Sequence, residues 1–97
     1  MTEWPFSDPP NVAVFVLKRI LDGTMPILRV CHDDDDGGWQ FLDGGPATND
    51  QAMLVSLRHM LNHDPSIAEL ADLPCGWDAT RTGPGNPWRR VRSESVE

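Results

Sequence analysis

Basic residues and long apolar runs are both scarce in this chain of 97 residues. Lysine and arginine together number 8 against 15 acidic residues, which gives a formal net charge of −7 at pH 7. A surface of this sign repels the phosphates of nucleic acids, so the charge argues against nucleic-acid binding and favours a basic protein partner. No window approaches the roughly 20 consecutive apolar residues that span a bilayer, so the sequence predicts no membrane segment.

Cysteine is also scarce, since the chain has only Cys31 and Cys75. Near the N-terminus, Glu3 and Asp8 stand where a secretory signal would carry positive charge. We therefore expect a cytoplasmic protein, in which the thiols stay reduced and do not form a structural disulfide.

The length of the chain and its hydrophobic content of 39% allow one modest core. We expect a single domain over residues 1–97, with an ordered core from about 12 to 88 and a frayed tail over 91–97. Three prolines in residues 1–10 predict an irregular, flexible arm, which either docks through Trp4 and Phe6 or stays partly ordered.

Short apolar segments bounded by glycine and proline indicate β-strands. A valine-rich segment is followed by turn chemistry at Asp22, Gly23 and Pro26, and the simplest pairing across that turn is an antiparallel hairpin. The predicted strands are residues 12–21, 27–32, 39–42 and 77–82.

Two helices are expected between the last two of these strands. Asn49 or Asp50 caps a helix over about 50–62, whose apolar stripe includes Met53, Leu57 and Leu61. A shorter helix near 65–72 begins at Asp64 as N-cap, with proline at its first position.

The sequence thus predicts an α+β domain with a mainly antiparallel sheet of three or four strands, covered on one face by one long and one short helix. The predicted core consists of Val14, Val16, Ile27, Val30, Phe41, Met53, Leu57, Leu61, Ile67 and Leu70.

The segment CHDDDDGGWQFLDGG, residues 31–45, holds the candidate contact site. Four adjacent carboxylates repel one another, which predicts a solvated loop. The loop lacks the closing glutamate of an EF-hand, because Gly44 or Gly45 stands at that position, and we assign no metal to it. Trp39 is either an aromatic anchor beside the loop or, with Phe41, a wall of the core. The candidate partner-binding residues are Asp33, Asp34, Asp35, Asp36 and Trp39.

An alternative reading is a small metal- or thiol-dependent enzyme. His59 and His63 are four residues apart, as in helical zinc sites, but no short cysteine spacing accompanies them. Cys31 and His32 are neighbours on one strand and so point to opposite faces. The candidate metal-binding or catalytic residues for this alternative are Cys31, His32, His59, His63 and Cys75. The leading hypothesis is a binding protein, for which we assign no catalytic residue and no cofactor.

Arginines gather near the C-terminus around Trp88, a combination that can bind phosphates or stack on bases. The overall charge favours intramolecular contacts or simple solvation of these side chains instead. They are Arg81, Arg89, Arg90 and Arg92.

A series of motifs over about residues 12–88 resembles a family of small bacterial domains of unknown function. The first motifs are a Gly-x-x-Pro-Ile turn and an acidic loop before Gly-Trp-Gln-Phe, at Gly23, Met25, Pro26, Ile27, Gly38, Trp39, Gln40, Phe41 and Gly44. Similar positions in the second half are Asp64, Pro65, Ser66, Ile67, Leu70, Pro74, Gly76 and Arg81. The family includes immunity proteins of polymorphic toxin systems, type thirty-three in their nomenclature.

This resemblance implies an α+β domain that acts by binding, with no catalytic residues and no particular toxin identified. An acidic inhibitor is steered electrostatically toward the basic cleft of a nuclease, so an immunity role agrees with the charge. We expect a non-enzymatic acidic binding protein, whose oligomeric state the sequence leaves open.

Overall fold

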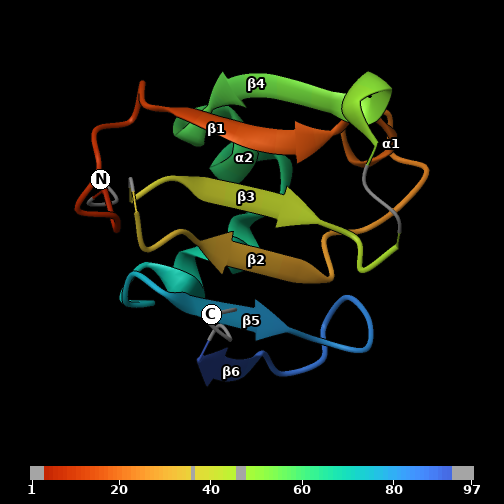
Figure 1. The fold of residues 1–97 in the computed structure, drawn as a ribbon. Coiled ribbons are helices and arrows are strands. Elements are labelled where there is room, and N and C mark those ends of the chain that lie inside the picture. Colours follow the sequence, from red (N-terminus) through yellow and green to blue (C-terminus); the bar gives the residue numbers. More distant parts are fainter. Residues whose placement is uncertain (1–3, 36, 46–47, 93–97) are drawn as a thin grey trace.

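The computed structural model of the protein describes residues 4–35, 37–45 and 48–92, and these form one mixed β-sheet with short helices (Figure 1). The strands are β1 (Ala13–Leu17), β2 (Arg29–His32), β3 (Trp39–Leu42), β4 (Ala52–Ser56), β5 (Trp77–Thr80) and β6 (Arg89–Arg92). The helices are α1 (Lys18–Leu21) and α2 (Leu57–His63), with 3-10 turns η1 (Asn49–Gln51) and η2 (Pro65–Leu70).

Across the described residues the six strands lie in the order β4-β1-β3-β2-β5-β6 (Figure 1). β1 and β3 are parallel, with Phe15 opposite Gln40. The other neighbouring pairs are antiparallel. The segment 33–38, called the acidic loop below, joins β2 to β3 as a hairpin. β1 pairs with the other edge of β3.

The predicted sheet of three or four strands with one long helix is therefore wrong. The described residues form six strands, one pair of them parallel, and α2 has only 7 residues. The expected hairpin between the first two strands is also wrong, because β1 pairs with β3 and β4 and not with β2. Residues 18–21, expected to continue the first strand, form α1 instead.

The largest error concerns residues 52–56, which were expected to begin the long helix and instead form β4. Pairing with all five residues of β1 supplies their backbone hydrogen bonds. The helix begins only at Leu57, where the Ser56 hydroxyl accepts a hydrogen bond from the His59 amide at 3.1 Å. The cap is thus Ser56 and not Asn49 or Asp50, and Met53 is 38% exposed.

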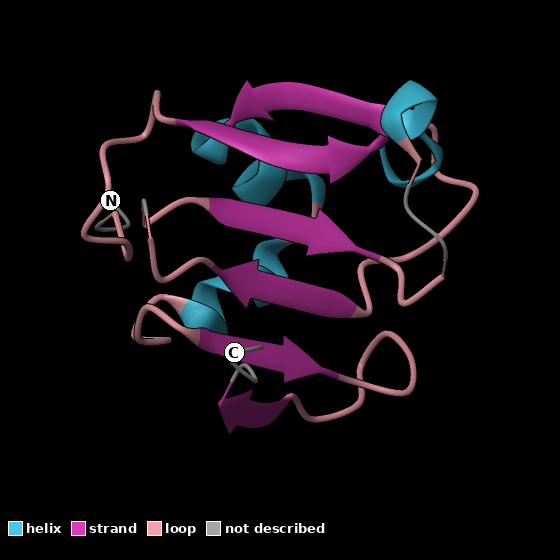
Figure 2. Ribbon diagram, in the orientation of Figure 1, coloured by secondary structure: helices cyan, strands magenta, loops and turns pink. Residues whose placement is uncertain are grey.

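The helices α2 and η2 lie behind the sheet and cover one of its faces (Figure 2). Their buried side chains Leu57, Met60, Ile67 and Leu70 join those of the strands in one core. All of the predicted core residues except Met53 and Leu61 are buried, and Leu61 packs against the core from a partly exposed position. The short second helix begins as predicted, with the Asp64 carboxylate accepting from the Ser66 amide.

The described part of the N-terminal arm docks on this core. Phe6 is only 5% exposed and meets Trp39 edge to face, with ring centroids 5.4 Å apart. Asp8 accepts hydrogen bonds from Trp4 Nε1 at its carbonyl and from Trp39 Nε1 at its carboxylate. The sequence left two alternatives for this arm, a docked one and a partly ordered one. For residues 4–10 the arm is docked on the core.

At the other end of the chain, β6 includes residues 91 and 92 of the expected tail, and residues 93–97 lie outside the described part. Among the described residues, no helix has the length and apolar character needed to cross a membrane.

Candidate functional site

The face of the sheet opposite α2 and η2, here called the open face, carries one row of side chains across all the strands. Successive residues of a strand point to opposite faces, and cross-strand partners share a face. Following the strand registers from β4 to β6, the row consists of Leu54, Phe15, Gln40, Cys31, Asp78 and Val91.

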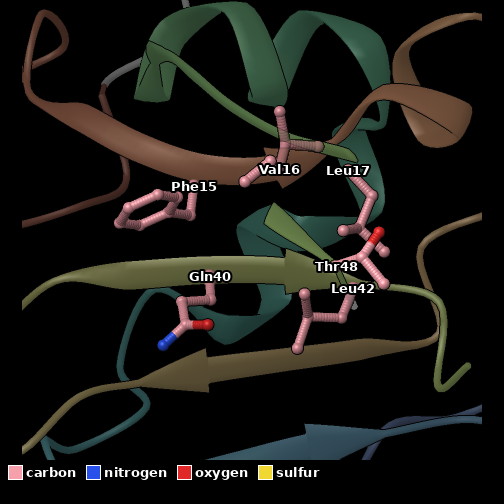
Figure 3. A pocket seen from close by; sticks show the side chains of 7 residues that line it. Phe15, Val16, Leu17, Gln40, Leu42 and Thr48 are labelled. Atoms are coloured by element: carbon pink, nitrogen blue, oxygen red, sulfur yellow. The ribbon is translucent and has the colours of Figure 1, made fainter. Parts of the chain in front are cut away.

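The β4 and β1 end of this row is apolar and exposed. Phe15 is 49% exposed and Leu54 62%, and the two are direct cross-strand partners. Beside them, a groove of about 220 Å³ is lined by Phe15, Leu17, Leu42 and other residues of β1, β3 and β4 (Figure 3). An aromatic and a leucine side chain next to an apolar groove form a surface that a partner's side chains can cover.

The other half of the row is polar. Asp78 is 8% exposed, and one of its carboxylate oxygens lies 2.8 Å from a guanidinium nitrogen of Arg29. Cys31 lies between Gln40 and Asp78, and burial together with the Asp78 carboxylate raises the pKa of its thiol to about 11. At neutral pH this sulfur is a protonated, unreactive thiol.

The acidic loop is attached to the open face through Gln40. The Gln40 side-chain amide donates to both carboxylate oxygens of Asp33, at 3.1 and 2.9 Å. The Asp33 amide also donates to the Gly38 carbonyl at 2.8 Å, which closes the loop. Asp34 and Asp35 are exposed, as expected for a solvated loop, and Asp36 lies outside the described residues.

Trp39 points to the helix-covered face and is only 2% exposed. Its indole is part of the core, as the alternation with Phe41 indicated, so it does not provide an exposed anchor for a partner. The exposed aromatic side chain is Phe15, which the sequence reasoning did not single out. Its position between Val14 and Val16 was the available signal, because the residue between two buried strand positions faces the other side.

The candidate metal ligands are spread over the described structure, apart from one contact between His32 and Cys75. His59 and His63 are both exposed on α2. Within the described part of the chain, no group of three or more histidine, cysteine, aspartate or glutamate side chains is placed to hold a metal ion. Cys31 and His32 do point to opposite faces, but Cys75 lies 3.6 Å from the Nε2 atom of His32. That pairing was not predicted.

Two of the C-terminal arginines make intramolecular contacts. Arg81 is buried against Trp88, with its guanidinium carbon 4.2 Å from the ring centroid, and it also pairs with Asp64 at 2.9 Å. Arg90 bonds to Asp72 at 2.8 Å and to the carbonyl of Glu69. Neither side chain bonds to the acidic loop in these contacts, and both are directed toward the η2 side of the sheet.

No family model matches the sequence, and searches of the curated proteins and of the solved structures return no significant match. The resemblance to the immunity-protein family therefore stays a prediction from its motifs. The features of the structure that bear on function are the open face, the acidic loop and the surroundings of Cys31 and Cys75.

Proposed function

We propose that this chain is a non-enzymatic protein-binding domain of the cytoplasm that contacts a basic protein through its open face. The observation that carries this proposal is the exposure of Phe15, which lines the groove, beside its exposed cross-strand partner Leu54. Aromatic side chains that become buried at the centre of a contact supply much of the binding free energy in protein complexes. In this proposal Phe15 is the anchor and Leu54 extends its contact.

Charge determines the class of partner. The net charge of −7 attracts a basic surface, and the exposed carboxylates of Asp34 and Asp35 extend from the loop that Gln40 ties to the open face. Gln40 is the cross-strand neighbour of Phe15, so the apolar anchor and the acidic loop flank one continuous surface. Such an arrangement accelerates association with a basic partner and leaves most of the affinity to the apolar contact.

A basic nuclease-type toxin is the partner that best combines this charge with the motif resemblance of the chain. The domain would act as an immunity protein by covering the positively charged cleft of the toxin. In such a mechanism the chain makes and breaks no covalent bond, and it requires neither a metal nor a cofactor.

The test uses the purified product of the adjacent gene, with binding followed by surface plasmon resonance and toxicity by co-expression. The double variant Phe15→Ser/Leu54→Ser is expected to weaken binding by about 30-fold or more, as for hot-spot residues worth about 2 kcal/mol. Met25→Ser is the matched control, because Met25 is 37% exposed but lies in the turn before β2 and not on the open face.

The variant Asp34→Asn/Asp35→Asn is expected to slow association and to flatten its salt dependence, with little change in dissociation. Wild-type affinity of a folded Phe15→Ser/Leu54→Ser variant would remove the open face from the proposal. An adjacent gene product that is neither toxic nor bound would reject the immunity role.

A further inference from the structure

The loop between η2 and β5 places the Cys75 thiol against the imidazole of His32, a residue 43 positions earlier in the chain. Cys75 Sγ lies 3.6 Å from His32 Nε2, within hydrogen-bonding distance for sulfur. Cys75 is exposed, so a small molecule in solvent can reach the sulfur. The pair thus combines an accessible nucleophile with a base in contact with it.

The orientation of His32 leaves the correct nitrogen free to act as that base. Nδ1 lies 2.7 Å from the carbonyl oxygen of Leu73, and because a carbonyl only accepts, Nδ1 must carry the proton and donate it. In the neutral ring Nε2 is then unprotonated and faces the Cys75 S–H.

The imidazole is also held in place by an aromatic neighbour. Its ring stacks on that of Trp39, with centroids 3.8 Å apart and an angle of 12° between the planes. The Trp39 indole is itself fixed by its hydrogen bond to Asp8. The stack on Trp39 and the hydrogen bond to Leu73 thus hold the ring with Nε2 toward Cys75.

The backbone next to Cys75 is fixed as well. The amide of Gly76 donates to the carbonyl of His32 at 2.7 Å, and Gly76 has a φ of +83°, a conformation that favours glycine. Asp34 of the acidic loop lies against this turn, because a Cβ atom on Gly76 would be 3.5 Å from the Asp34 side chain. The Asp34 side chain therefore lies beside the turn that carries the Cys75 thiol.

We propose that Cys75 and His32 form a thiol-modification site that exchanges with low-molecular-weight disulfides and prefers cationic to anionic ones. The Cys75 thiol gives its proton to His32 Nε2, and the thiolate attacks one sulfur of the disulfide R–S–S–R. A bond forms between Cys75 Sγ and that sulfur while the S–S bond breaks. The leaving thiolate takes the proton from His32, so the Cys75 sulfur is oxidised, the disulfide is reduced and one thiol RSH is released.

The product is a mixed disulfide that persists, because the other cysteine of the chain cannot resolve it. Cys31 is buried on the open face, in the environment that raises the pKa of its thiol to about 11. The preference for cations follows from Asp34 beside Gly76 and from the net charge of −7. This site lies apart from the Phe15 and Leu54 surface, although it shares Asp34 with the acidic loop of the proposed binding function.

The test treats the purified full chain with cystamine, a cationic disulfide, or with oxidised glutathione, an anionic one, and follows the adducts by mass spectrometry. One adduct is expected, at Cys75, and cystamine should react about tenfold faster at low salt. Cys31→Ser should react as the wild type does, whereas Cys75→Ser should form no adduct. Modification of Cys31 in preference to Cys75 would overturn the assignment.

Two further measurements test the role of His32. His32→Gln keeps a side-chain amide that can donate to Leu73 but removes the base, so the rate at Cys75 should fall at least about tenfold. A pentapeptide of residues 73–77 carries the same thiol without the imidazole, and its slower reaction than the folded chain tests the pair even if His32→Gln does not fold.

Equal rates for the folded chain and the pentapeptide would reject activation by His32, as would a folded His32→Gln variant that reacts like the wild type. Asp34→Asn should reduce the ratio of the cystamine rate to the glutathione-disulfide rate. An unchanged ratio would reject the electrostatic basis of the preference.

Discussion

The two faces of the sheet differ although every strand contributes to both. On the covered face, Val30, Phe41 and Ala79 have no exposed surface, and the helices contribute Ile67 and Leu57 to the same core. On the open face Cys31 and Asp78 in the middle of the row are buried, but the side chains at its ends are exposed. Each strand therefore buries one set of alternate side chains under the helices, while the other set includes the exposed Phe15, Leu54 and Val91.

The two cysteines also differ in solvent exposure, with Cys31 buried and Cys75 exposed. Cys31 belongs to the open face but is only 8% exposed, and its thiol is kept protonated. Cys75 belongs to a loop, is exposed, and contacts an imidazole that is fixed by the covered face through Trp39. The two sulfurs therefore differ in their access to solvent and in whether a base lies in contact with them.

The largest difference between the faces should appear on truncating a phenylalanine on each. Phe41→Ala is expected to lower the free energy of unfolding by about 3–5 kcal/mol, because it opens a cavity in the core. Phe15→Ala, on the half-exposed side chain, should cost less than about 1 kcal/mol. Urea unfolding of both variants measures the difference, and similar losses would show that the open face is as important for stability as the core.

The second comparison is between two ion pairs. Arg81 donates to Asp64, Ser66 and the Ile27 carbonyl, and its side chain is only 2% exposed, so Arg81→Ala should cost about 3 kcal/mol. Arg29 pairs with Asp78 on the open face, where its side chain is 46% exposed, and Arg29→Ala should cost about 1 kcal/mol or less. Thermal unfolding of the two variants would contradict the comparison if the order were reversed.

The smallest effect concerns the pH dependence of the covered-face ion pair. Burial acts to raise the pKa of Asp64, but hydrogen bonds from Ser66 and the charge of Arg81 outweigh it and lower that pKa. A lowered folded-state pKa gives stability above the unfolded value of about 3.9, and this stability is lost as the pH falls below it.

We therefore expect Asp64→Asn to lose less stability than the wild type between about pH 5 and about pH 3, although it is less stable near neutrality. Urea midpoints across this range measure the two slopes. A steeper acid loss in Asp64→Asn than in the wild type would contradict the assignment of the lowered pKa to this contact.

The sequence located much of the fold but not its topology. Alternation identified the positions of β2, β3 and β5, and the cap at Asp64 identified the start of η2. The segment at 52–56 was misread because Met53, Leu54 and Val55 form an unbroken apolar run, which fits a helix with Leu57 and Leu61 as well as it fits a strand. Residues 52–56 form a strand because they pair with the edge of β1. The sequence of β1 lies nearly forty positions earlier in the chain, so local periodicity does not show this pairing.

The predicted exposure of the candidate partner-binding residues agrees with the structure in part. The solvated acidic loop agrees for Asp34 and Asp35, but Trp39 belongs to the core and Phe15 is the exposed aromatic side chain. The sequence could place Phe15 on the face opposite Val14 and Val16, yet it could not show which face the helices would cover. The partner and the immunity role remain predictions.

By itself, then, the sequence determined the charge, the solvated loop and most of the buried side chains, because these follow from composition and local periodicity. Only the tertiary structure decided the order of the strands, the exposure of Phe15 beside Leu54 and the contact of Cys75 with His32. These features depend on pairing between distant segments, and a local pattern of apolar and polar residues does not specify which edge a strand will join.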